Sequence, residues 1–384
     1  MIYLDNHATT ACDPQVLAAM MPFFTESYGN ASSPHELGQA AAAAVSIAQA
    51  QVATLVGGEL EEIVFTSGAT ESNNLALLGV ARQHEQRGGA RRRLVTTAIE
   101  HKSVLAPLEY LAGLGWDLVY LPVDETGRVD LHKAQELITE ETLLVSVQAA
   151  NSEIGTIQPL AELAELAHAR GALMHCDASQ AAGKIALNVT QLQVDLLSLS
   201  GHKMYGPKGI GVLWVRGGSR RLPLTPLMYG GGHAGGLRSG TLPVPLIVGL
   251  GVASELAVEQ LLAESQRTAA LRDEFEQFLV EELRIVIVNG AVKQRLPNNT
   301  SLTFAGLDAE ALLANLPELV ASTGAACESG SVEPSRVLLA LGLTQEQAFG
   351  TIRFGLGRFT TAQEIRKAAS QIITAYRQLA LLLA

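Results

Sequence analysis

The stretch Val194-Asp195-Leu196-Leu197-Ser198-Leu199-Ser200-Gly201-His202-Lys203 places a lysine directly after an apolar run that is typical of a buried strand. Gly206-Pro207-Lys208-Gly209 then turns the chain into a second apolar run at 210–215. A lysine at such a strand end is partly desolvated, which helps its amine to lose a proton and attack a carbonyl. The pattern predicts that Lys203 forms a Schiff base with a carbonyl cofactor. The alternative is a solvated surface lysine, and the surrounding residues decide between the two.

Apolar strands alternate with helical patterns through the middle of the chain. The clearest helical pattern covers 159–170, with Pro159 in its first turn and Gly171 just past its end. This alternation predicts an α/β fold in which a mainly parallel sheet lies between two layers of helices. The expected strands cover residues 63–66, 94–97, 143–148, 172–176, 194–199 and 211–215.

The pattern of the sequence changes near residue 252. A charged helical pattern runs to residue 283, and short strands and helices follow it. We predict a large domain at 15–252 and a smaller α+β domain formed by 1–14 and 253–384. Two stretches of low charge, at 37–58 and 239–254, are assigned to the core. The first is rich in alanine and contains three glutamines, and the second contains prolines, so neither is typical of a membrane span.

Composition excludes several classes of protein. The 384 residues carry a net charge of −11, which argues against a general nucleic-acid binder. Cys12, Cys176 and Cys327 form no Cys-x-x-Cys pair, so we expect neither a disulfide framework nor a metal site. The N-terminus has no signal-peptide pattern. These features together predict a globular enzyme of the reducing cytoplasm, without a membrane segment.

The segment Ser67-Gly68-Ala69-Thr70-Glu71-Ser72-Asn73 lies between an expected strand and a helical pattern. Glycine and small hydroxyl residues at a helix start offer backbone N–H groups and the helix dipole to a phosphate. The segment is no P-loop, because no Gly-Lys-Ser/Thr sequence follows it. The alternative is a simple helix cap. We predict a phosphate cradle that includes Ala69 and Thr70.

Further polar residues follow the other expected strands, where ligands bind in open α/β sheets. His101 can stack on an aromatic cofactor or move protons, and Asp177 can keep a pyridine nitrogen protonated. Asn151 and Gln180 add amide groups. Each residue has an ordinary structural alternative. Together with the cradle and Lys203, however, they match the set of groups that pyridoxal phosphate requires.

Two residues in the last part of the chain indicate the reaction. Cys327 lies in Ser322-Thr323-Gly324-Ala325-Ala326-Cys327-Glu328-Ser329-Gly330-Ser331. Because small residues predominate there, we expect an exposed loop with a nucleophilic thiol rather than a core cysteine. Arg353 interrupts the apolar segment Thr351-Ile352-Arg353-Phe354-Gly355. It is either a solvated charge at a sheet edge or a bidentate clamp on a substrate carboxylate.

With these residues in place, the chain resembles the cysteine desulfurases of the NifS/IscS group. These are class V aminotransferase-like enzymes of fold type I that depend on pyridoxal 5'-phosphate. The matching motifs span nearly the whole length. They are Tyr3-Leu4-Asp5-Asn6, Ala8-Thr9-Thr10, the predicted phosphate cradle, Glu100-His101, Asn151-Ser152-Glu153-Ile154-Gly155, Asp177-Ala178-Ser179-Gln180, Ser200-Gly201-His202-Lys203, Arg238-Ser239-Gly240-Thr241, the Cys327 loop with Glu333-Pro334-Ser335, and Arg353.

The resemblance implies a role for each residue around the cofactor. Lys203 would carry the cofactor as a Schiff base and move protons, and His101 would stack on its ring. Asp177 would pair with the ring nitrogen and Gln180 with the 3'-hydroxyl. The resemblance assigns the phosphate to the cradle residues Ala69 and Thr70, to Ser200 and His202, and to Thr241 of a neighbouring subunit, which implies a homodimer.

The resemblance also implies the reaction. Asn151 and Arg353 would bind the carboxylate of L-cysteine. Cys327 would attack the sulfur of the cysteine–cofactor adduct, leaving L-alanine and an enzyme persulfide. The sulfur would then pass to an acceptor, such as an iron–sulfur scaffold or a thiolation protein.

The chain departs from the family pattern at three places. Ala325-Ala326 precedes Cys327 where Ser-Ala is common, and Glu328 follows it where small or hydroxyl residues are common. An acid beside a thiol raises the pKa of the thiol and weakens the thiolate, which bears on the turnover rate more than on the reaction type. His7 stands in a motif where other residues are common, and the motif gives it no role.

Other functions make different demands on the sequence. A selenocysteine lyase, a cysteine/cystine lyase or a small-substrate aminotransferase of this fold needs no persulfide-forming cysteine, so Cys327 favours the desulfurase. A non-catalytic sulfur-trafficking protein would be expected to lack Lys203, Asp177 or Cys327. Gly230-Gly231-Gly232-His233-Ala234-Gly235-Gly236 lacks the strand-to-helix context of a nucleotide-binding loop.

Overall fold

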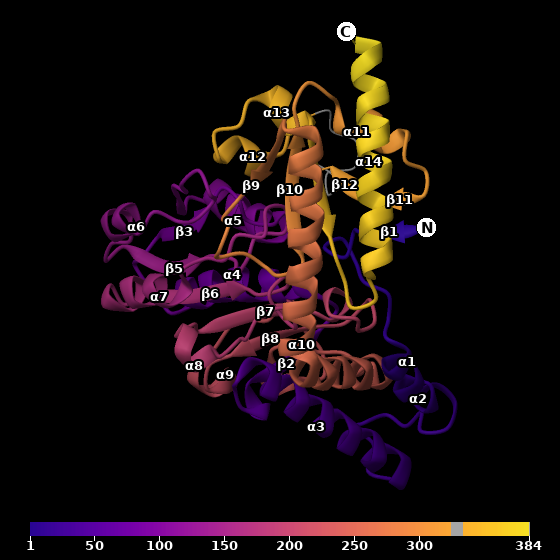
Figure 1. Ribbon diagram of the computed structural model, residues 1–384. Helices are drawn as coiled ribbons and strands as arrows, with labels where there is room; N and C mark the ends of the chain where they lie inside the picture. The colour runs from indigo at the N-terminus through magenta and orange to yellow at the C-terminus, as the bar shows by residue number, and fades with distance from the viewer. Residues whose placement is uncertain (324–332, 384) are drawn as a thin grey trace.

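The computed structural model describes residues 1–323 and 333–383, and its largest element is a seven-stranded sheet (Figure 1). The strand order is β2-β8-β7-β6-β5-β3-β4, with β8 antiparallel to both of its neighbours and the other pairs parallel. The predicted α/β fold with a mainly parallel sheet is therefore confirmed. The strands are β2 (Ile63–Thr66), β3 (Arg93–Thr97), β4 (Asp117–Leu121), β5 (Thr142–Ser146), β6 (Leu173–Asp177), β7 (Leu196–Ser200) and β8 (Gly211–Val215).

Strand β4 is the one strand of this sheet that the sequence did not predict. It lies at the edge of the sheet and pairs only with β3 among the described strands. Asp117 and Tyr120 are exposed, and only Leu121 is buried. An edge strand of this kind lacks the continuous apolar run by which the buried strands were recognised.

Two layers of helices cover the sheet, because alternate side chains of each strand point to opposite faces. On one face, Leu94 and Leu144 pack with apolar residues of α4 and α5. On the other face, Val95 and Val145 pack with α3, α6, α7 and α10. The helices of this part are α1 (Pro14–Met20), α2 (Pro22–Thr25), α3 (Glu36–Val56), α4 (Ala69–Gln86), α5 (Lys102–Gly113), α6 (Leu131–Leu137), α7 (Leu160–Ala169), α8 (Val189–Leu192), α9 (Gly218–Arg221) and α10 (Val244–Leu283), with 3-10 turns η1 (Leu60–Glu62), η2 (Gly201–Lys203) and η3 (Ala234–Gly236).

A second core forms around an antiparallel sheet of order β12-β13-β10-β9. A parallel pair, β1 with β11, joins the N-terminus to this core, and Ile2 and Leu4 are buried in it. The elements are β1 (Ile2–Tyr3), β9 (Val286–Asn289), β10 (Asn299–Phe304), β11 (Leu319–Val320), β12 (Ser322–Thr323), β13 (Thr351–Gly355), α11 (Ala309–Ala314), α12 (Arg336–Ala340), α13 (Gln345–Phe349) and α14 (Ala362–Leu383).

Helix α10 connects the two cores as one continuous helix of 40 residues (Figure 1). Its first part packs in the core of the large sheet through Ile247 and Leu250, and its last part packs in the second core through Phe275 and Leu279. A boundary at residue 252 would therefore fall inside this helix. The division into 15–252 and 1–14 with 253–384 stays a prediction.

Helices α3 and α10 are each long and apolar enough, by length and composition, to cross a membrane. Both contribute residues to the core of the large sheet, among them Ala41 and Val45 of α3 and Ile247 of α10. The core helices of many globular proteins have the same composition, so these two helices are weak grounds for a membrane span.

Candidate functional site

A cavity of about 590 Å³ lies at the carboxyl ends of the strands. This volume suits a small organic ligand or cofactor. The cavity brings together most of the predicted cofactor-binding residues, whereas its described lining does not include Asn151, Thr241 or Arg353. Its lining consists of Ala8, Thr9, Ser67, Gly68, Ala69, Thr70, Glu71, His101, Ser103, Gln148, Ala150, Ser152, Asp177, Ser179, Gln180, Ser200, His202, Lys203, Lys208 and Gly209.

The start of α4 opens into this cavity. Gly68 precedes the helix with φ 151° and ψ 176°, a conformation that glycine adopts easily and other residues do not. No side chain among the described residues caps the helix there. Its first N–H groups are therefore available to an anion, with the positive end of the helix dipole behind them. The predicted phosphate cradle thus has the backbone geometry that such a site requires.

Asp177, at the end of β6, is held by several hydrogen bonds. One carboxylate oxygen accepts from the backbone N–H of Ser179 at 3.0 Å and from its hydroxyl at 2.5 Å. The other oxygen accepts from Nδ2 of Asn73 on α4 at 2.8 Å. The acid is therefore fixed in position on the lining of the cavity.

The same network orients His101, which caps the start of α5. His101 Nδ1 accepts a hydrogen bond from the backbone N–H of Ser103 at 3.1 Å, so this nitrogen carries the lone pair and the neutral ring is protonated at Nε2. The hydroxyl of Ser103 lies 2.7 Å from Nδ1 and accepts from Asn73 at 2.8 Å. Burial is the main cause that lowers the pKa of His101, which favours the neutral, stacking form.

Lys203 ends the 3-10 turn that follows β7, at the position that the sequence predicted. Its Nζ donates hydrogen bonds to the backbone carbonyls of His7 and, at 2.9 Å, of Ala8. Beside it, His202 Nδ1 lies 3.1 Å from Oγ1 of Thr9. Burial, with the charge of Lys203 next, lowers the pKa of His202 to about 4. The N-terminal segment thus forms one wall of the lysine site.

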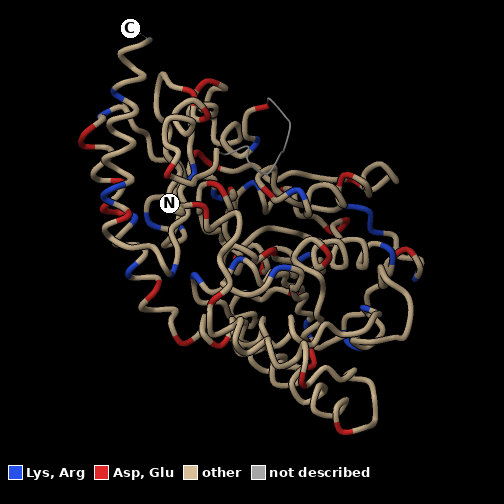
Figure 2. Tube along the Cα trace, turned by 90° about the vertical axis from the view of Figure 1, so that its right-hand side faces the viewer, with Lys and Arg blue, Asp and Glu red and all other residues tan. Residues whose placement is uncertain are grey.

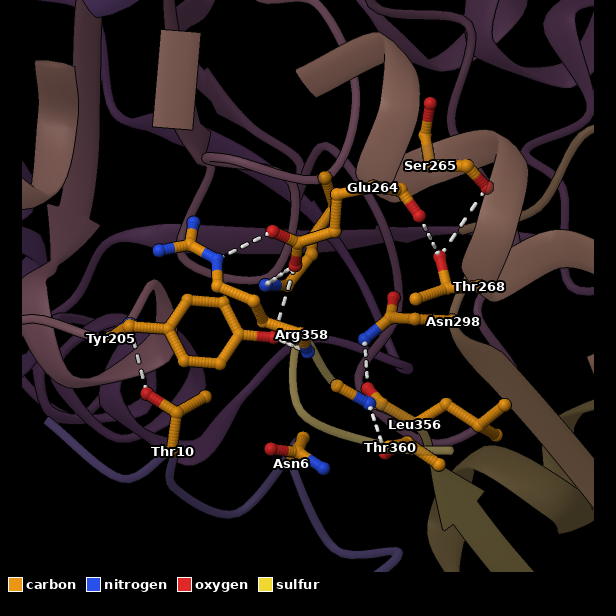
Figure 3. Close-up of polar contacts among 12 residues, drawn as sticks. Asn6, Thr10, Tyr205, Glu264, Ser265, Thr268, Asn298, Leu356, Arg358 and Thr360 are labelled. Carbon is orange, nitrogen blue, oxygen red and sulfur yellow. Dashed lines mark hydrogen bonds and ion pairs between the residues drawn. The ribbon is translucent and has the colours of Figure 1, made fainter. Parts of the chain in front are cut away.

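Tyr205 anchors the loop that carries Lys203 (Figure 3). Its backbone has φ 64°, which a bulky residue adopts only when its surroundings hold it there. The phenol donates to Oε1 of Glu264 at 3.0 Å and accepts from the backbone N–H of Arg358 at 2.5 Å. Its own backbone N–H donates to Oγ1 of Thr10 at 2.8 Å. Because Glu264 lies on α10 and Arg358 follows β13, this anchor ties the lysine loop to both cores.

Arg353 lies in the middle of the second core, not at a solvated sheet edge. Strand β13 has β12 on one side and β10 on the other, and the Arg353 side chain is 2% exposed. Its Nη2 forms an ion pair with Asp5 at 2.8 Å, and its Nη1 donates to the carbonyl of Ser152 at 3.4 Å. The structure therefore rejects the edge interpretation. The carboxylate clamp stays a prediction.

Asn151 is also engaged in local structure. Its Oδ1 accepts from the backbone N–H groups of Glu153 and Ile154, and its Nδ2 donates to the carbonyl of Ile99 at 2.9 Å. These bonds shape the loop that contains Ser152. Asn151 thus connects the cavity wall to the Arg353 region, and its predicted contact with a substrate stays untested.

Two predicted residues remain, and of these Thr241 is not part of the described lining of the cavity. Thr241 is exposed, although the nearby Arg238 pairs with Glu71 of α4 at 3.0 Å. Cys327 lies outside the described residues. The described segments on either side of it are close to the site: Ser322 of β12 pairs with Arg353, and Ser335 donates to Oε2 of Glu153 at 2.5 Å.

Comparison with known proteins identifies the family. The family described as Aminotransferase class-V matches residues 2–367. The chain belongs to this family. It is 46% identical to Cysteine desulfurase IscS of Rickettsia akari (strain Hartford), over 97% of this chain and 90% of that protein. It is 45% identical to Cysteine desulfurase IscS of Anaeromyxobacter sp. (strain Fw109-5), over 98% of this chain and 93% of that protein.

Solved structures agree with this assignment. A NifS-like protein superimposes with a TM-score of 0.90 at 37% identity, covering 97% of this chain and 98% of its own. DndA from Streptomyces lividans gives a TM-score of 0.78 at 40% identity, covering 92% and 99%. The similarity to class-V aminotransferases thus extends over both cores.

Class-V aminotransferases of the cysteine desulfurase type depend on pyridoxal 5'-phosphate, and this chain is an enzyme of that type. The cavity fits the cofactor, because one helix start offers uncapped N–H groups to a phosphate and a fixed carboxylate lies on the same lining. The cavity lining also includes His101, whose ring is neutral, and Lys203, which follows a strand end. These are the remaining groups that the cofactor requires.

Several residues of this class-V site were not predicted individually. Asn73 was quoted only as the end of a motif, yet it lies four residues after Ala69 and thus on the same face of α4. Ser103 follows His101 by two residues, which is the spacing of a helix cap. Tyr205 gave no signal, because its partners are distant in the sequence.

Proposed function

We propose that the chain is an L-cysteine desulfurase, which converts L-cysteine to L-alanine and transfers the sulfur to Cys327 as a persulfide. The observation that carries the proposal is the convergence of Lys203, Asp177 and His101 on one cavity, in a chain that resembles cysteine desulfurases over 97% of its length. When bound, pyridoxal 5'-phosphate supplies an electron sink that makes the carbon–sulfur bond of the substrate easier to break.

The described residues support a division of roles around the cofactor. The start of α4 with Ala69 and Thr70, together with Ser200 and His202, would hold the phosphate. The Asp177 carboxylate is fixed where it can hold a proton on the pyridine nitrogen, and Gln180 lines the wall beside it. His101 offers a neutral ring face, and Lys203 offers an amine that carries and moves protons.

Substrate binding is assigned to Arg353 and Asn151. A guanidinium can bind a carboxylate through two parallel hydrogen bonds. In this structure Asp5 already supplies one carboxylate oxygen to Arg353 at 2.8 Å. Binding of L-cysteine would therefore require its carboxylate to share or replace the contact with Asp5.

The nucleophile is assigned to Cys327 rather than to either described cysteine. Cys176 is buried within β6, and burial raises the pKa of its thiol well above the ordinary value. Burial also raises the pKa of Cys12, with the nearby Asp13 adding to the effect. In the proposed reaction, the Sγ of Cys327 bonds to the substrate sulfur while the carbon–sulfur bond breaks. The former substrate carbon gains a proton to give alanine.

We also propose that the enzyme is a homodimer, in which Thr241 reaches the phosphate of the partner. Thr241 is exposed in the single chain, which leaves its hydroxyl accessible to a neighbouring subunit. Leu17, Met21 and Phe24 of the α1–α2 region are about half exposed, as expected for apolar residues that a second subunit covers.

The proposed partners are L-cysteine and a sulfur-acceptor protein, such as an iron–sulfur scaffold or a thiolation protein. The proposed location is the cytoplasm, with no membrane and no nucleic acid as partners. Acidic residues outnumber basic ones, and Figure 2 shows the two kinds interspersed along the trace rather than gathered on one side.

Incubation of the purified enzyme with L-cysteine and pyridoxal 5'-phosphate tests the proposal. Alanine and sulfide should form in equal amounts when a reductant is present, and a persulfide should be found on Cys327 by mass spectrometry. Cys327→Ser should keep the cofactor and lose the persulfide, because a hydroxyl is a poor nucleophile toward sulfur. Unchanged turnover in Cys327→Ser would assign the enzyme to a lyase reaction instead.

A further inference from the structure

His7 lies between the proposed cofactor site and the Arg353 strand, and the family motif gives it no role. Its side chain is 2% exposed. The ring packs directly on the backbone of Gly355, since a Cβ atom at that position would lie 2.6 Å from Cδ2 of His7. Gly355 is two residues after Arg353 on β13. On its other side, His7 contacts Gln180, which lines the cavity.

The hydrogen bonds between His7 and Gln180 fix the orientation of both side chains. Gln180 Nε2 donates to the backbone carbonyl of His7 at 3.1 Å. A carbonyl only accepts, so the other end of the amide must be the oxygen. That oxygen, Oε1, lies 2.9 Å from Nδ1 of His7. An oxygen of this kind also only accepts, so Nδ1 of His7 carries a hydrogen and Nε2 carries a lone pair.

The surroundings keep the ring of His7 neutral. Burial is the main cause that lowers its pKa to about 3, and the charge of Arg353 lowers it further. Lys203 and Lys184 act in the same direction, and only the bond to Gln180 opposes them. Arg353 is itself paired with Asp5. Within the described part of the chain, Nε2 of His7 is buried without a hydrogen-bond partner, which costs free energy.

We propose that His7 is a positioning residue, which locks the amide of Gln180 so that its second N–H points to the phenolic oxygen of pyridoxal 5'-phosphate. The inference rests on the proposed placement of the cofactor beside Gln180. Gln180 Nε2 has two hydrogens, of which the His7 carbonyl takes one. Because His7 ties the amide oxygen as well, the amide cannot turn that oxygen toward the cofactor.

The lock has a spectroscopic consequence. A hydrogen bond donated to the phenolic oxygen favours the form of the cofactor in which that oxygen carries full negative charge. The bond therefore lowers the pH at which the visible absorption band of the holoenzyme changes. Loss of the lock should move this transition to higher pH, and loss of Gln180 should move it further.

A double-mutant cycle on the holoenzyme tests the proposal. Gln180→Ala should raise the midpoint of the absorbance titration by about one pH unit, which is a tenfold change in the equilibrium. His7→Leu should raise it by roughly half as much, because the amide keeps only one tie. His7→Asn is the matched control, since its amide N–H replaces Nδ1–H, and its midpoint should stay within about 0.2 unit.

In the double variant with His7→Leu and Gln180→Ala, the midpoint should equal that of Gln180→Ala alone. Additive shifts, or equal shifts in His7→Leu and His7→Asn, would overturn the proposal. Nitrogen-15 NMR of the histidines is independent of the desulfurase reaction. It should show one ring with Nδ1 protonated and Nε2 bare, absent in His7→Asn. A His7 ring protonated at Nε2 would overturn the lock even in an active desulfurase.

Discussion

Lys203 and Arg353 are two cations of the proposed site, and their contacts include different kinds of group. Backbone carbonyls of His7 and Ala8 accept hydrogen bonds from the ammonium of Lys203. The carboxylate of Asp5 pairs with Arg353. A neutral acceptor stabilises the charged form of an amine less than a carboxylate does, so the amine can lose its proton more easily. An arginine binds a carboxylate in its charged form and does not need to lose a proton. These contacts support the proposed roles, in which Lys203 reacts and Arg353 binds the substrate.

The two cations also differ in where they lie. Lys203 is on the cavity wall at the end of β7, and Arg353 is inside the second core on β13. The N-terminal segment touches both, through the His7 carbonyl and the Asp5 carboxylate. A short segment with a single buried histidine therefore links the proposed reactive group to the proposed binding group.

Arg353→Gln should break the binding half of this comparison. The amide cannot clamp a carboxylate with two charged hydrogen bonds, so kcat/KM for L-cysteine should fall roughly 30- to 100-fold. The visible band of the cofactor should remain, since Lys203 is untouched. Because the partly buried Asp5 would lose its ion pair with Arg353, the double variant Asp5→Asn with Arg353→Gln is the matched control for folding. A kcat/KM within threefold of wild type in both variants would remove Arg353 from substrate binding.

Tyr205→Phe should weaken the anchor of the lysine loop. The phenylalanine ring keeps the packing but leaves Glu264 and the Arg358 N–H without the phenol, so we expect a loss of about 1–3 kcal/mol of unfolding free energy. Urea denaturation measures it. Tyr376→Phe is the matched control, since its hydroxyl makes one bond to the carbonyl of Ala305 at 3.0 Å near the surface. Equal losses of unfolding free energy in the two variants would show that the hydrogen bonds of Tyr205 stabilise the protein no more than that of a surface tyrosine.

His7→Asn should reduce the sensitivity of the fold to acid. The pKa of His7 is about 3 in the folded protein and about 6.5 in the unfolded chain, so the unfolded chain binds more protons between these values. The stabilisation is complete above pH 6.5 and is lost as the pH falls toward 3. His7 should change the free energy of unfolding by up to about 1.4 kcal/mol per pH unit in this range. The variant His7→Asn should remove this contribution. Urea denaturation at pH 4.5, 5.5 and 6.5 measures the free energy of unfolding of the wild type and of His7→Asn. An identical pH dependence in the two proteins would mean that the His7 ring is charged in the folded protein.

The sequence predicted the large sheet better than the second core. Strands buried on both faces, such as β5 and β7, are continuous apolar runs that can be read directly. Edge strand β4 and the two-residue strands β1, β11 and β12 depend on distant pairing and leave no comparable pattern. Helix α10 crosses both cores, so a change in composition at residue 252 did not mark a break in structure.

In the site, too, local patterns could be predicted from the sequence and distant contacts could not. Residues at the ends of predicted strands, including Asp177 and Lys203, were found because the sheet brings those ends together. The partners of Arg353 and Tyr205 could not be predicted, because Asp5 and Glu264 reach them only through tertiary packing. His7 could be noticed in its motif, but its contact with Gln180 spans 173 residues.

Reduction of the holoenzyme with borohydride tests the central claim most directly. If Lys203 is the amine that holds the cofactor in this cavity, borohydride should fix the pyridoxal group covalently, and peptide mapping should find it on Lys203. The label should be absent from Lys203→Ala and retained in Lys133→Ala, which removes an exposed lysine on α6. A wild-type protein that carries the label on another lysine, or that takes up none when saturated with pyridoxal 5'-phosphate, would contradict the account.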